Sequence, residues 1–219
     1  MSFEYSVIPS TRYSDVINML RFSFYDEPLN VSVGLCKCGE PCESLEKYNL
    51  ATMEDNMSIM AVDKCTNEIA GVCLNGISRP SDSEVCRKRL EQGDIKYKLI
   101  FGLLFDANQE ANLFEKFKVD KIFELRVLCV AHNFRSRKIA SELLIQSEAV
   151  AAKNGFSLLK IDATSFFTQK LATKMGYYEV KSVAYNDFKD ENGSQQYTTP
   201  APHDTYKIMV KEITAACSF

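Results

Sequence analysis

The stretch Leu125-Arg-Val-Leu-Cys-Val-Ala-His-Asn-Phe-Arg-Ser-Arg-Lys-Ile-Ala-Ser-Glu-Leu-Leu-Ile145 decides how the rest of the sequence is interpreted. It begins as an apolar, β-branched run, passes through a short polar segment, and continues with apolar residues at helical spacing. A strand that leads into a helix through a polar turn directs several main-chain N–H groups, and the positive end of the helix dipole, toward one point. Arg135, Arg137 and Lys138 are expected to add mobile positive charge to this turn. The stretch therefore predicts either a phosphate-binding turn or an ordinary strand-to-helix connection with a solvated basic face.

Length and composition restrict the classes of protein that this sequence can represent. The 219 residues are 46% hydrophobic and 25% charged, which is ordinary for a soluble globular protein, and we expect one domain over residues 1–219. A net charge of −3 argues against a nucleic-acid-binding surface, so any phosphate site must be local. We see neither a signal-peptide pattern nor an apolar run long enough to cross a bilayer, and we expect no membrane partner.

Eight cysteines raise the question of disulfides or a metal site. Cys73 and Cys129 lie within apolar strand patterns, where thiols act as small buried hydrophobic groups, so we expect reduced thiols and a cytoplasmic protein. The segment Cys36-Lys-Cys-Gly-Glu-Pro-Cys42 lacks the paired Cys-x-x-Cys spacing of common zinc sites, and both histidines are far away in sequence. We therefore expect no metal and interpret these three residues as free thiols on a loop.

Hydrophobic periodicity divides the whole chain into strands, helices and two loops. Strands are predicted over residues 3–8, 58–62, 69–74, 121–130, 157–163, 177–183 and 205–213. Helices are predicted from Val16 to near Glu27, where Pro28 follows, and over residues 83–92, 95–117, 137–153 and 166–175. Residues 29–48 and 186–202 are predicted to be loops, the first with short helical pieces at 44–48. The strand–helix–strand unit at 121–163 requires a parallel pair, whereas the hairpins require antiparallel pairing. The expected fold is α/β, a central mixed sheet with helices on both faces.

This order of elements, together with its turn, resembles the GNAT superfamily of acyl-CoA-dependent N-acyltransferases. In that family the pyrophosphate-binding turn has the pattern Arg/Gln-x-x-Gly-x-Gly/Ala, and Arg135-Ser-Arg-Lys-Ile-Ala140 keeps the first and last positions. Lys138 replaces the central glycine, and Ser136 stands where glycine is also common. A Cβ partly fills the space that glycine leaves for the pyrophosphate. The turn is expected to donate its N–H groups if its φ angles are negative, with Lys138 reaching a phosphate from outside; the alternative is weakened or lost acyl-CoA binding.

Further segments are similar, more narrowly, to the insect arylalkylamine N-acetyltransferases. They are Phe24-Tyr-Asp-Glu-Pro-Leu-Asn30, Leu45-Glu-Lys-Tyr48, Gly71-Val-Cys-Leu-Asn-Gly76, Lys174-Met-Gly-Tyr177 and Ala201-Pro-His203. The resemblance implies direct transfer of the acetyl group of acetyl-CoA to the primary amine of an arylalkylamine. Two other functions stay open at this point: acetylation of aliphatic amines such as polyamines or agmatine, or with longer acyl-CoAs, and non-catalytic binding of acyl-CoA.

Acetyl transfer needs a base, because the amine arrives as an ammonium ion, and a donor that polarises the thioester carbonyl. Glu27 is predicted to be the base, with its pKa raised by partial burial; alternatively, Asp26 and Glu27 form an exposed acidic pair. The resemblance gives Thr164 and Thr168, which match serines of the family, the proton relay and the protonation of the leaving thiolate. The alternative is that Thr164 is only a helix N-cap, a role that Ser165 could also take.

The remaining predicted site residues line the amine pocket or contact acetyl-CoA. Pro28 and His203 are expected beside Glu27 in the amine pocket, although a lone histidine is often structural. A strand bulge would expose a main-chain N–H at Val130. Lys170 and Lys174 would either meet CoA phosphates or form a solvated helix face. The predicted acetyl-CoA contacts are Leu128, Cys129, Val130, Arg135, Ser136, Arg137, Lys138, Ile139, Ala140, Ser141, Lys170 and Lys174.

Overall fold

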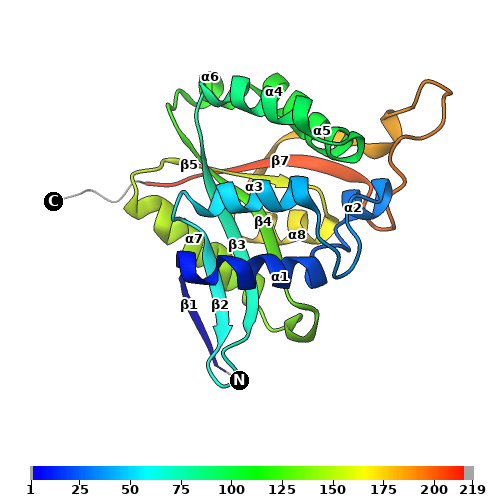
Figure 1. Cartoon of the computed structure of the whole chain (residues 1–219). Helices are drawn as coiled ribbons and strands as arrows, with labels where there is room; N and C mark the ends of the chain where they lie inside the picture. The colour runs from blue at the N-terminus through cyan, green and yellow to red at the C-terminus, as the bar shows by residue number, and fades with distance from the viewer. Residues whose placement is uncertain (1, 215–219) are drawn as a thin grey trace.

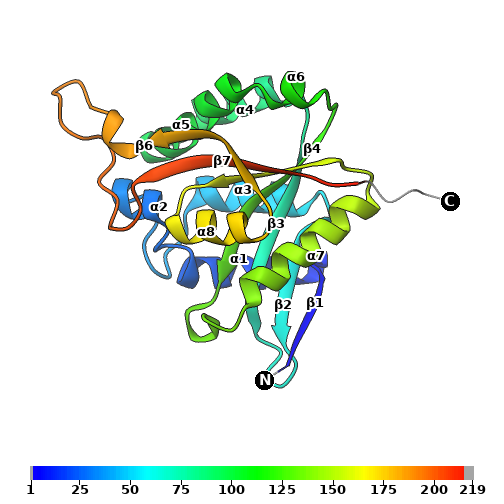
Figure 2. The same cartoon turned by 180° about the vertical axis from the view of Figure 1, so that it is seen from behind.

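A sheet of seven strands forms the centre of the protein, and helices cover both of its faces (Figures 1 and 2). The computed structural model describes residues 2–214, so the first and the last five residues of the expected domain lie outside it. The strands, in their order across the sheet, are β1 (Phe3–Val7), β2 (Ile59–Asp63), β3 (Ile69–Ser78), β4 (Ile122–Val130), β5 (Leu158–Ala163), β7 (Thr205–Glu212) and β6 (Tyr178–Ala184). The pair β4–β5 is parallel and the other five pairs are antiparallel, which confirms the predicted mixed sheet.

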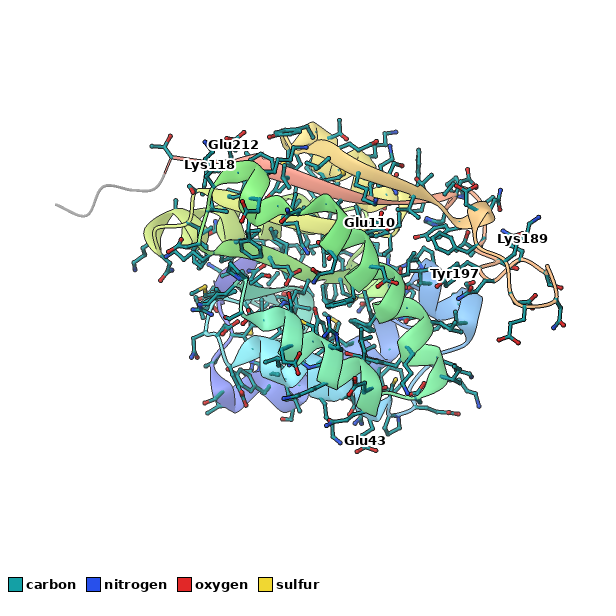
Figure 3. All side chains as sticks on the ribbon, turned by 90° about the horizontal axis from the view of Figure 1, so that it is seen from above. Glu43, Glu110, Lys118, Lys189, Tyr197 and Glu212 are labelled. Atoms are coloured by element: carbon teal, nitrogen blue, oxygen red, sulfur yellow. The ribbon has the colours of Figure 1, made fainter. Side chains whose placement is uncertain are left out.

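The helices form two layers, one on each face of the sheet. The first layer contains α1 (Tyr13–Ser23), α2 (Pro28–Val33), α3 (Glu43–Met53), α4 (Asp82–Gln92), α5 (Ile95–Ala111) and α6 (Leu113–Phe117). The second contains α7 (Ile139–Lys153) and α8 (Phe166–Lys174), which lie in front of the sheet in Figure 2. Short 3₁₀ turns occupy Ser10–Arg12, His132–Phe134 and Tyr185–Asp187. Seen from above, α4 and α5 pass over the sheet (Figure 3).

Apolar side chains at helical or alternating spacing form three clusters between these layers. The α7 cluster includes Leu143 and Leu144 against Phe123 and Leu159, and it is closed to solvent. The other two clusters lie under α1 and α5 on the opposite face of the sheet. Burial of this kind, at roughly 25 cal/mol per Å² of apolar surface, is what stabilises the layers. Within residues 2–214, none of the helices is long and apolar enough to cross a bilayer.

The pairing of the two central strands stops early, and this opens the sheet. Residues 123–125 of β4 pair with residues 159–161 of β5, and the ladder ends there. On its other edge, β4 has a register shift against β3, and Arg126 is the extra residue of this β-bulge. A bulge bends its strand and increases the local twist, so β4 turns away from β5 beyond Arg126. The bulge expected near Val130 is therefore located four residues earlier.

The segment predicted as a loop between residues 29 and 48 contains two helices. The helix α1 ends at Ser23, and Glu27 is the N-cap of the next helix, α2, rather than the end of the first. Pro28 is the first residue of α2, a position where its missing N–H is not needed by the helix. The first helix stops before Pro28, slightly earlier than predicted, but the helix that begins at Pro28 was missed, because proline is compatible with both the end of one helix and the first turn of another.

A second difference concerns the long helix predicted over residues 95–117. Asn112 adopts a left-handed conformation with φ of 42°, which ends α5 and separates it from α6. Asparagine tolerates this conformation better than most residues, because its side chain bonds locally. The apolar stripe of the predicted helix is continuous in sequence, and the break at Asn112 was therefore not visible in the periodicity.

Candidate active site

A cleft of about 640 Å³ lies where β4 and β5 diverge. It brings together segments that are far apart in sequence: residues 26–28, 125–130, 134–141, Thr164, Ser165, Phe167, Thr168 and His203. All predicted site residues line it except two. Lys170 and Lys174 are exposed on α8 and lie outside the lining, so their contact with CoA phosphates stays a prediction beside the solvated-face alternative.

The turn between β4 and α7 has the backbone of a glycine-rich turn without its glycines. Ser136 and Lys138 have φ angles of 65° and 62°, in the left-handed region where glycine is most easily accommodated. Negative φ angles, the condition under which the turn was expected to donate its N–H groups, are therefore not found at these two residues. Lys138 is the N-cap of α7, and its carbonyl accepts the first helical bond from the N–H of Glu142 at 3.2 Å. The N–H groups of residues 139–141 precede this bond, so the positive end of α7 is directed at the cleft and fits an anionic group.

Arg135 is not a mobile charge, as expected from the sequence, but a fixed tie between two walls of the cleft. Its two terminal nitrogens donate to the two carboxylate oxygens of Asp26 at 2.9 and 3.2 Å. Its Nε donates to the carbonyl of Val130 at 3.2 Å, and one terminal nitrogen also reaches the carbonyl of Ser23. The hydrogen-bonded carboxylate of Asp26 raises the pKa of Arg135. Asp26 and Arg135 are 109 residues apart, and the sequence pattern held no signal for this pair.

One edge of β4 exposes main-chain groups to the cleft. The N–H of Ala131 donates to the carbonyl of Ala70, on the β3 side. Since main-chain groups alternate between the two edges of an antiparallel strand, those of Leu128 and Val130 are directed away from β3 and toward the cleft. The predicted main-chain donor at Val130 is therefore available without a bulge at that residue. The thiol of Cys129 points elsewhere: it is buried and donates to the carbonyl of Ser23 at 3.4 Å.

Glu27 is the carboxylate of the cleft, and it is held by the helix that it caps. Its Oε2 accepts the N–H of Asn30 at 2.9 Å, whereas Oε1 is buried and has no partner in hydrogen-bonding geometry among the described residues. Burial raises the pKa of Glu27 above its ordinary value of 4.5, while the neighbouring Thr164 hydroxyl and the N–H of Asn30 act in the opposite direction. The residue as a whole is half-buried and lines the cleft, but its Oε1 is closed to solvent. A pKa of Glu27 that is raised by burial was predicted for its role as the base.

Three hydroxyl residues follow β5 at the floor of the same cleft. Ser165 is the N-cap of α8: its Oγ accepts the N–H of Thr168 at 3.1 Å and donates to the hydroxyl of Thr168 at 2.9 Å. The alternative in which Thr164 is the cap was wrong, because that position is one residue too early. The Thr164 carbonyl instead accepts the Tyr185 hydroxyl at 2.8 Å. The hydroxyl of Thr164 is consequently left to face Glu27.

His203 is nearly buried, at 9% exposure, and faces both the cleft and α8. Its Nδ1 accepts the N–H of Phe166 at 3.1 Å, so the proton of the neutral ring is on Nε2. Burial lowers the pKa of His203 and favours this neutral form. The ring meets Phe167 edge to face at 5.4 Å between centroids. The residue thus combines the structural and the pocket-lining interpretations of the sequence.

The cysteine segment lies outside the cleft. All seven cysteines among residues 2–214 are free, and no group of three His, Cys, Asp or Glu side chains in that part of the chain has a metal-binding arrangement. Cys36 and Cys42 interact through their thiols beside a small cavity between α1 and α3. The hydrogen bond from Cys36 lowers the pKa of Cys42 to about 6.

A mixed sheet that opens beside a helix N-terminus is the architecture of the GNAT N-acyltransferases. No protein-family model matches the chain. Among solved structures, arylalkylamine N-acetyltransferase 2 from Aedes aegypti is 41% identical, with a TM-score of 0.94 over 98% of this chain and 100% of that one. A polyamine N-acetyltransferase from Drosophila melanogaster that forms N-acetylagmatine is 19% identical, with a TM-score of 0.85 over 97% of this chain and 100% of that one. A NatC complex bound to a Gag peptide and CoA is 11% identical, with a TM-score of 0.56 over 98% and 100%.

The identity and coverage of the mosquito enzyme show the family, whereas the other two likenesses show the fold alone. The chain belongs to the arylalkylamine N-acetyltransferase family of insects, within the GNAT superfamily. It is accordingly an acyltransferase, as the resemblance of its motifs implied.

Proposed function

We propose that the protein acetylates the primary amine of an arylalkylamine, such as dopamine, tryptamine or serotonin, with acetyl-CoA as the acetyl donor. The observation that carries the proposal is the position of Glu27: its buried Oε1 has no partner in hydrogen-bonding geometry among residues 2–214, and the residue lines the same cleft as the N-terminus of α7. One end of the cleft is suited to a cationic amine and the other to a pyrophosphate. Family membership supports the same reaction.

Glu27 begins the reaction by accepting a proton from the ammonium group, directly or through a water molecule. Its raised pKa brings it closer to the pH at which a general base works best, and its negative charge also attracts the amine. The hydroxyl of Thr164 lies beside the carboxylate and can relay this proton. The neutral amine then attacks the thioester carbon, the C–N bond forms, and the C–S bond breaks to release CoA.

Main-chain and hydroxyl donors stabilise the negative charge that develops on the thioester oxygen and on the departing sulfur during the transfer. The N–H of Val130, on the open edge of β4, polarises the thioester carbonyl. Thr168 donates its hydroxyl proton to the departing sulfur, and Ser165 holds that hydroxyl at 2.9 Å. The N–H groups of residues 139–141 and the turn before them hold the pyrophosphate. The products are the N-acetylated amine, CoA thiol and a proton, which balances the reaction without an acyl-enzyme.

Aromatic side chains in the cleft favour an aromatic amine over an aliphatic one. Phe24, Phe134 and Phe167 line the cleft, and Phe167 is 65% exposed, so it is available to pack against a ring. The imidazole of His203 lies against Phe167 and presents Nε2–H as a donor. Pro28 completes this wall beside Glu27.

The test is the release of free CoA thiol from acetyl-CoA with dopamine, tryptamine, histamine, putrescine and agmatine as acceptors. We expect the highest kcat/KM with the aromatic amines. A higher value with putrescine or agmatine would assign the enzyme to aliphatic amines instead. No release with any amine, together with thermal stabilisation by acetyl-CoA, would identify a non-catalytic acyl-CoA-binding protein.

We also propose that the enzyme works in the cytoplasm. The seven cysteines of residues 2–214 are free thiols, and this supports a reducing compartment. Expression with a C-terminal fluorescent tag in insect cells, followed by fractionation, tests the location, and recovery in the secreted fraction would contradict it.

A further inference from the structure

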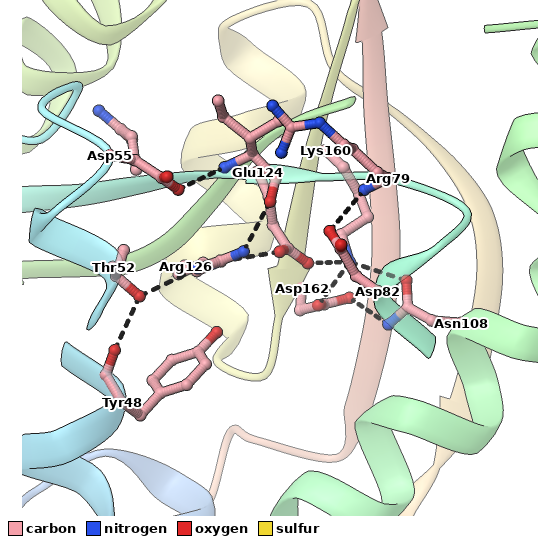
Figure 4. A network of polar contacts seen from close by, with 12 residues as sticks. Tyr48, Thr52, Asp55, Arg79, Asp82, Asn108, Glu124, Arg126, Lys160 and Asp162 are labelled. Carbon is pink, nitrogen blue, oxygen red and sulfur yellow. Dashed lines mark hydrogen bonds and ion pairs between the residues drawn. The ribbon is translucent and has the colours of Figure 1, made fainter. Parts of the chain in front are cut away.

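The strands β4 and β5 are held together by a cluster of four charged side chains at the point where they separate. The cluster contains Glu124 and Arg126 from β4 and Lys160 and Asp162 from β5, and Figure 4 shows these side chains directed toward one another. All four are largely buried, with side-chain exposures between 6% and 17%. Lys160 bridges Glu124 and Asp162, and so joins the two strands.

Arg126 fixes the bulge itself through three separate hydrogen bonds. Its Nε donates to Glu124 at 2.8 Å, one terminal nitrogen donates to the Thr52 hydroxyl of α3 at 3.1 Å, and the other donates to the carbonyl of Ile77 at 3.0 Å. The guanidinium lies against Gly76 of β3, where an added Cβ would come within 2.3 Å of its central carbon. The side chain therefore ties the extra residue of β4 to α3 and to β3 at the same time.

The position of this tie determines where the cleft begins. The β4–β5 ladder ends at Leu125, one residue before Arg126. The open edge of β4, with Leu128 and Val130, follows directly. Arg126 and Asp162 line the cleft and also a cavity of about 200 Å³ under α4 and α5, on the opposite face of the sheet. Arg126 and Asp162 therefore lie at the junction of the two strands, and they line a cavity on each face of the sheet.

From this arrangement we infer that Arg126 is a positioning residue for acetyl transfer: it fixes the direction of β4 and thereby the main-chain donors that hold the thioester. The inference rests on the proposed function. Because reacting groups must be placed to within a fraction of an ångström, a displacement of about 1 Å costs on the order of 10²-fold in rate. Arg126 itself is not a catalytic residue in this scheme.

The experiment compares Arg126→Lys and Thr52→Val with the wild-type enzyme. Lysine keeps the positive charge beside Glu124 but cannot make the three directed bonds, and valine removes one acceptor. We expect kcat/KM for acetyl-CoA to fall on the order of 10²-fold for Arg126→Lys. The fall in kcat/KM for acetyl-CoA should be smaller for Thr52→Val. KM for the amine should stay unchanged in both variants, because Glu27 and His203 lie on other elements.

A matched control separates positioning from general stability. Arg21 donates two hydrogen bonds to the carboxylate of Glu46, at 2.7 and 2.8 Å, and so joins α1 to α3 away from the β4 edge. Arg21→Lys should lower Tm but leave kcat/KM for acetyl-CoA as in the wild type. The inference is overturned if folded Arg126→Lys has wild-type kinetics for acetyl-CoA, or if Arg21→Lys loses as much; if Arg126→Lys does not fold, Thr52→Val decides in the same way.

A calorimetric titration with acetyl-CoA, without amine, keeps this inference distinguishable from the proposed function. If wild-type enzyme releases no thiol with any amine, the proposed function fails, but acetyl-CoA affinity still reports on the donors that hold the thioester. Weaker acetyl-CoA binding by Arg126→Lys, with unchanged binding by Arg21→Lys, would then support the positioning role. Equal acetyl-CoA affinity of Arg126→Lys and wild type would overturn it.

Discussion

Replacing Glu27 with glutamine separates the chemical from the structural role of this residue. The side-chain oxygen of glutamine can still accept the N–H of Asn30, which Glu27 accepts at 2.9 Å, so the cap of α2 is kept. The amide cannot take a proton from the amine. General-base catalysis contributes about 10²–10⁴-fold, so we expect kcat to fall by this factor, equivalent to about 3–5 kcal/mol in the activation free energy. KM for acetyl-CoA should change little, because the turn and α7 are untouched.

The same substitution should stabilise the protein at high pH. Because the pKa of Glu27 is raised in the folded state, wild-type stability falls as pH rises from 4.5 through the folded-state pKa. A tenfold difference in acid dissociation constant between the folded and unfolded states corresponds to about 1.4 kcal/mol. Glutamine has no charge to bury, so the Glu27→Gln variant becomes more stable than the wild type over that pH range. This difference in stability persists at higher pH. Thermal unfolding at pH 4.5 and pH 8, with kcat against pH at saturating amine, measures both effects. A kcat within threefold of wild type, or a variant less stable than wild type at pH 8, would refute the reasoning.

Three further substitutions test the turn, its tie and the leaving-group donor. Lys138→Gly removes a left-handed non-glycine residue, a conformation that costs about 1–2 kcal/mol, and opens space for the pyrophosphate; we expect tighter CoA binding by calorimetry and little change in Tm, because glycine adds chain entropy. Weaker binding would mean that the lysine itself holds a phosphate. Asp26→Asn weakens the pair with Arg135, which is 36–44% exposed, so urea denaturation should show a loss of about 1 kcal/mol or less, while KM for acetyl-CoA rises. Thr168→Val should lower kcat about 10²-fold and Thr168→Ser should not, if the hydroxyl protonates the thiolate. Equal rates for both would remove Thr168 from that role.

Much of the fold was predictable, because the burial pattern of each long element is local. The strand–helix–strand unit at residues 121–163 and the hairpins around it predicted the mixed sheet that is observed. The helix α2 was missed since six residues are too few for a period, and Pro28 marks a helix start as readily as a stop. The bulge at Arg126 was located four residues too late, because a register shift belongs to a pair of strands and leaves no mark on either one alone.

Site residues were predictable where the type of side chain implies a chemical role. They were less predictable where contacts with residues that are distant in sequence determine the position of the side chain. Glu27, Thr164 and the turn after β4 were all brought to one cleft, as expected from the resemblance. Arg135 was expected to be mobile, but Asp26 fixes it across 109 residues of sequence. The turn was expected to donate its N–H groups if its φ angles are negative, whereas Lys138 adopts a left-handed conformation although it has a side chain. Lys170 and Lys174 were chosen for their charge and their place on the helix after Thr164; both are exposed on α8, and their contact with CoA stays a prediction.

The early end of the β4–β5 ladder leaves part of β4 without a partner strand on the β5 side. An edge strand with unpaired N–H and C=O groups normally recruits another strand, and most proteins protect such edges on their surface. Here the free edge of β4 is inside the sheet, flanked by β5 and by the turn before α7, so a second protein chain meets neighbouring elements before it meets the edge. What can reach this edge is a slender, extended molecule that offers its own acceptors. The interruption in the ladder thus leaves main-chain groups of β4 unpaired with β5 inside the sheet, at a place where an extended small molecule has room to pair with them.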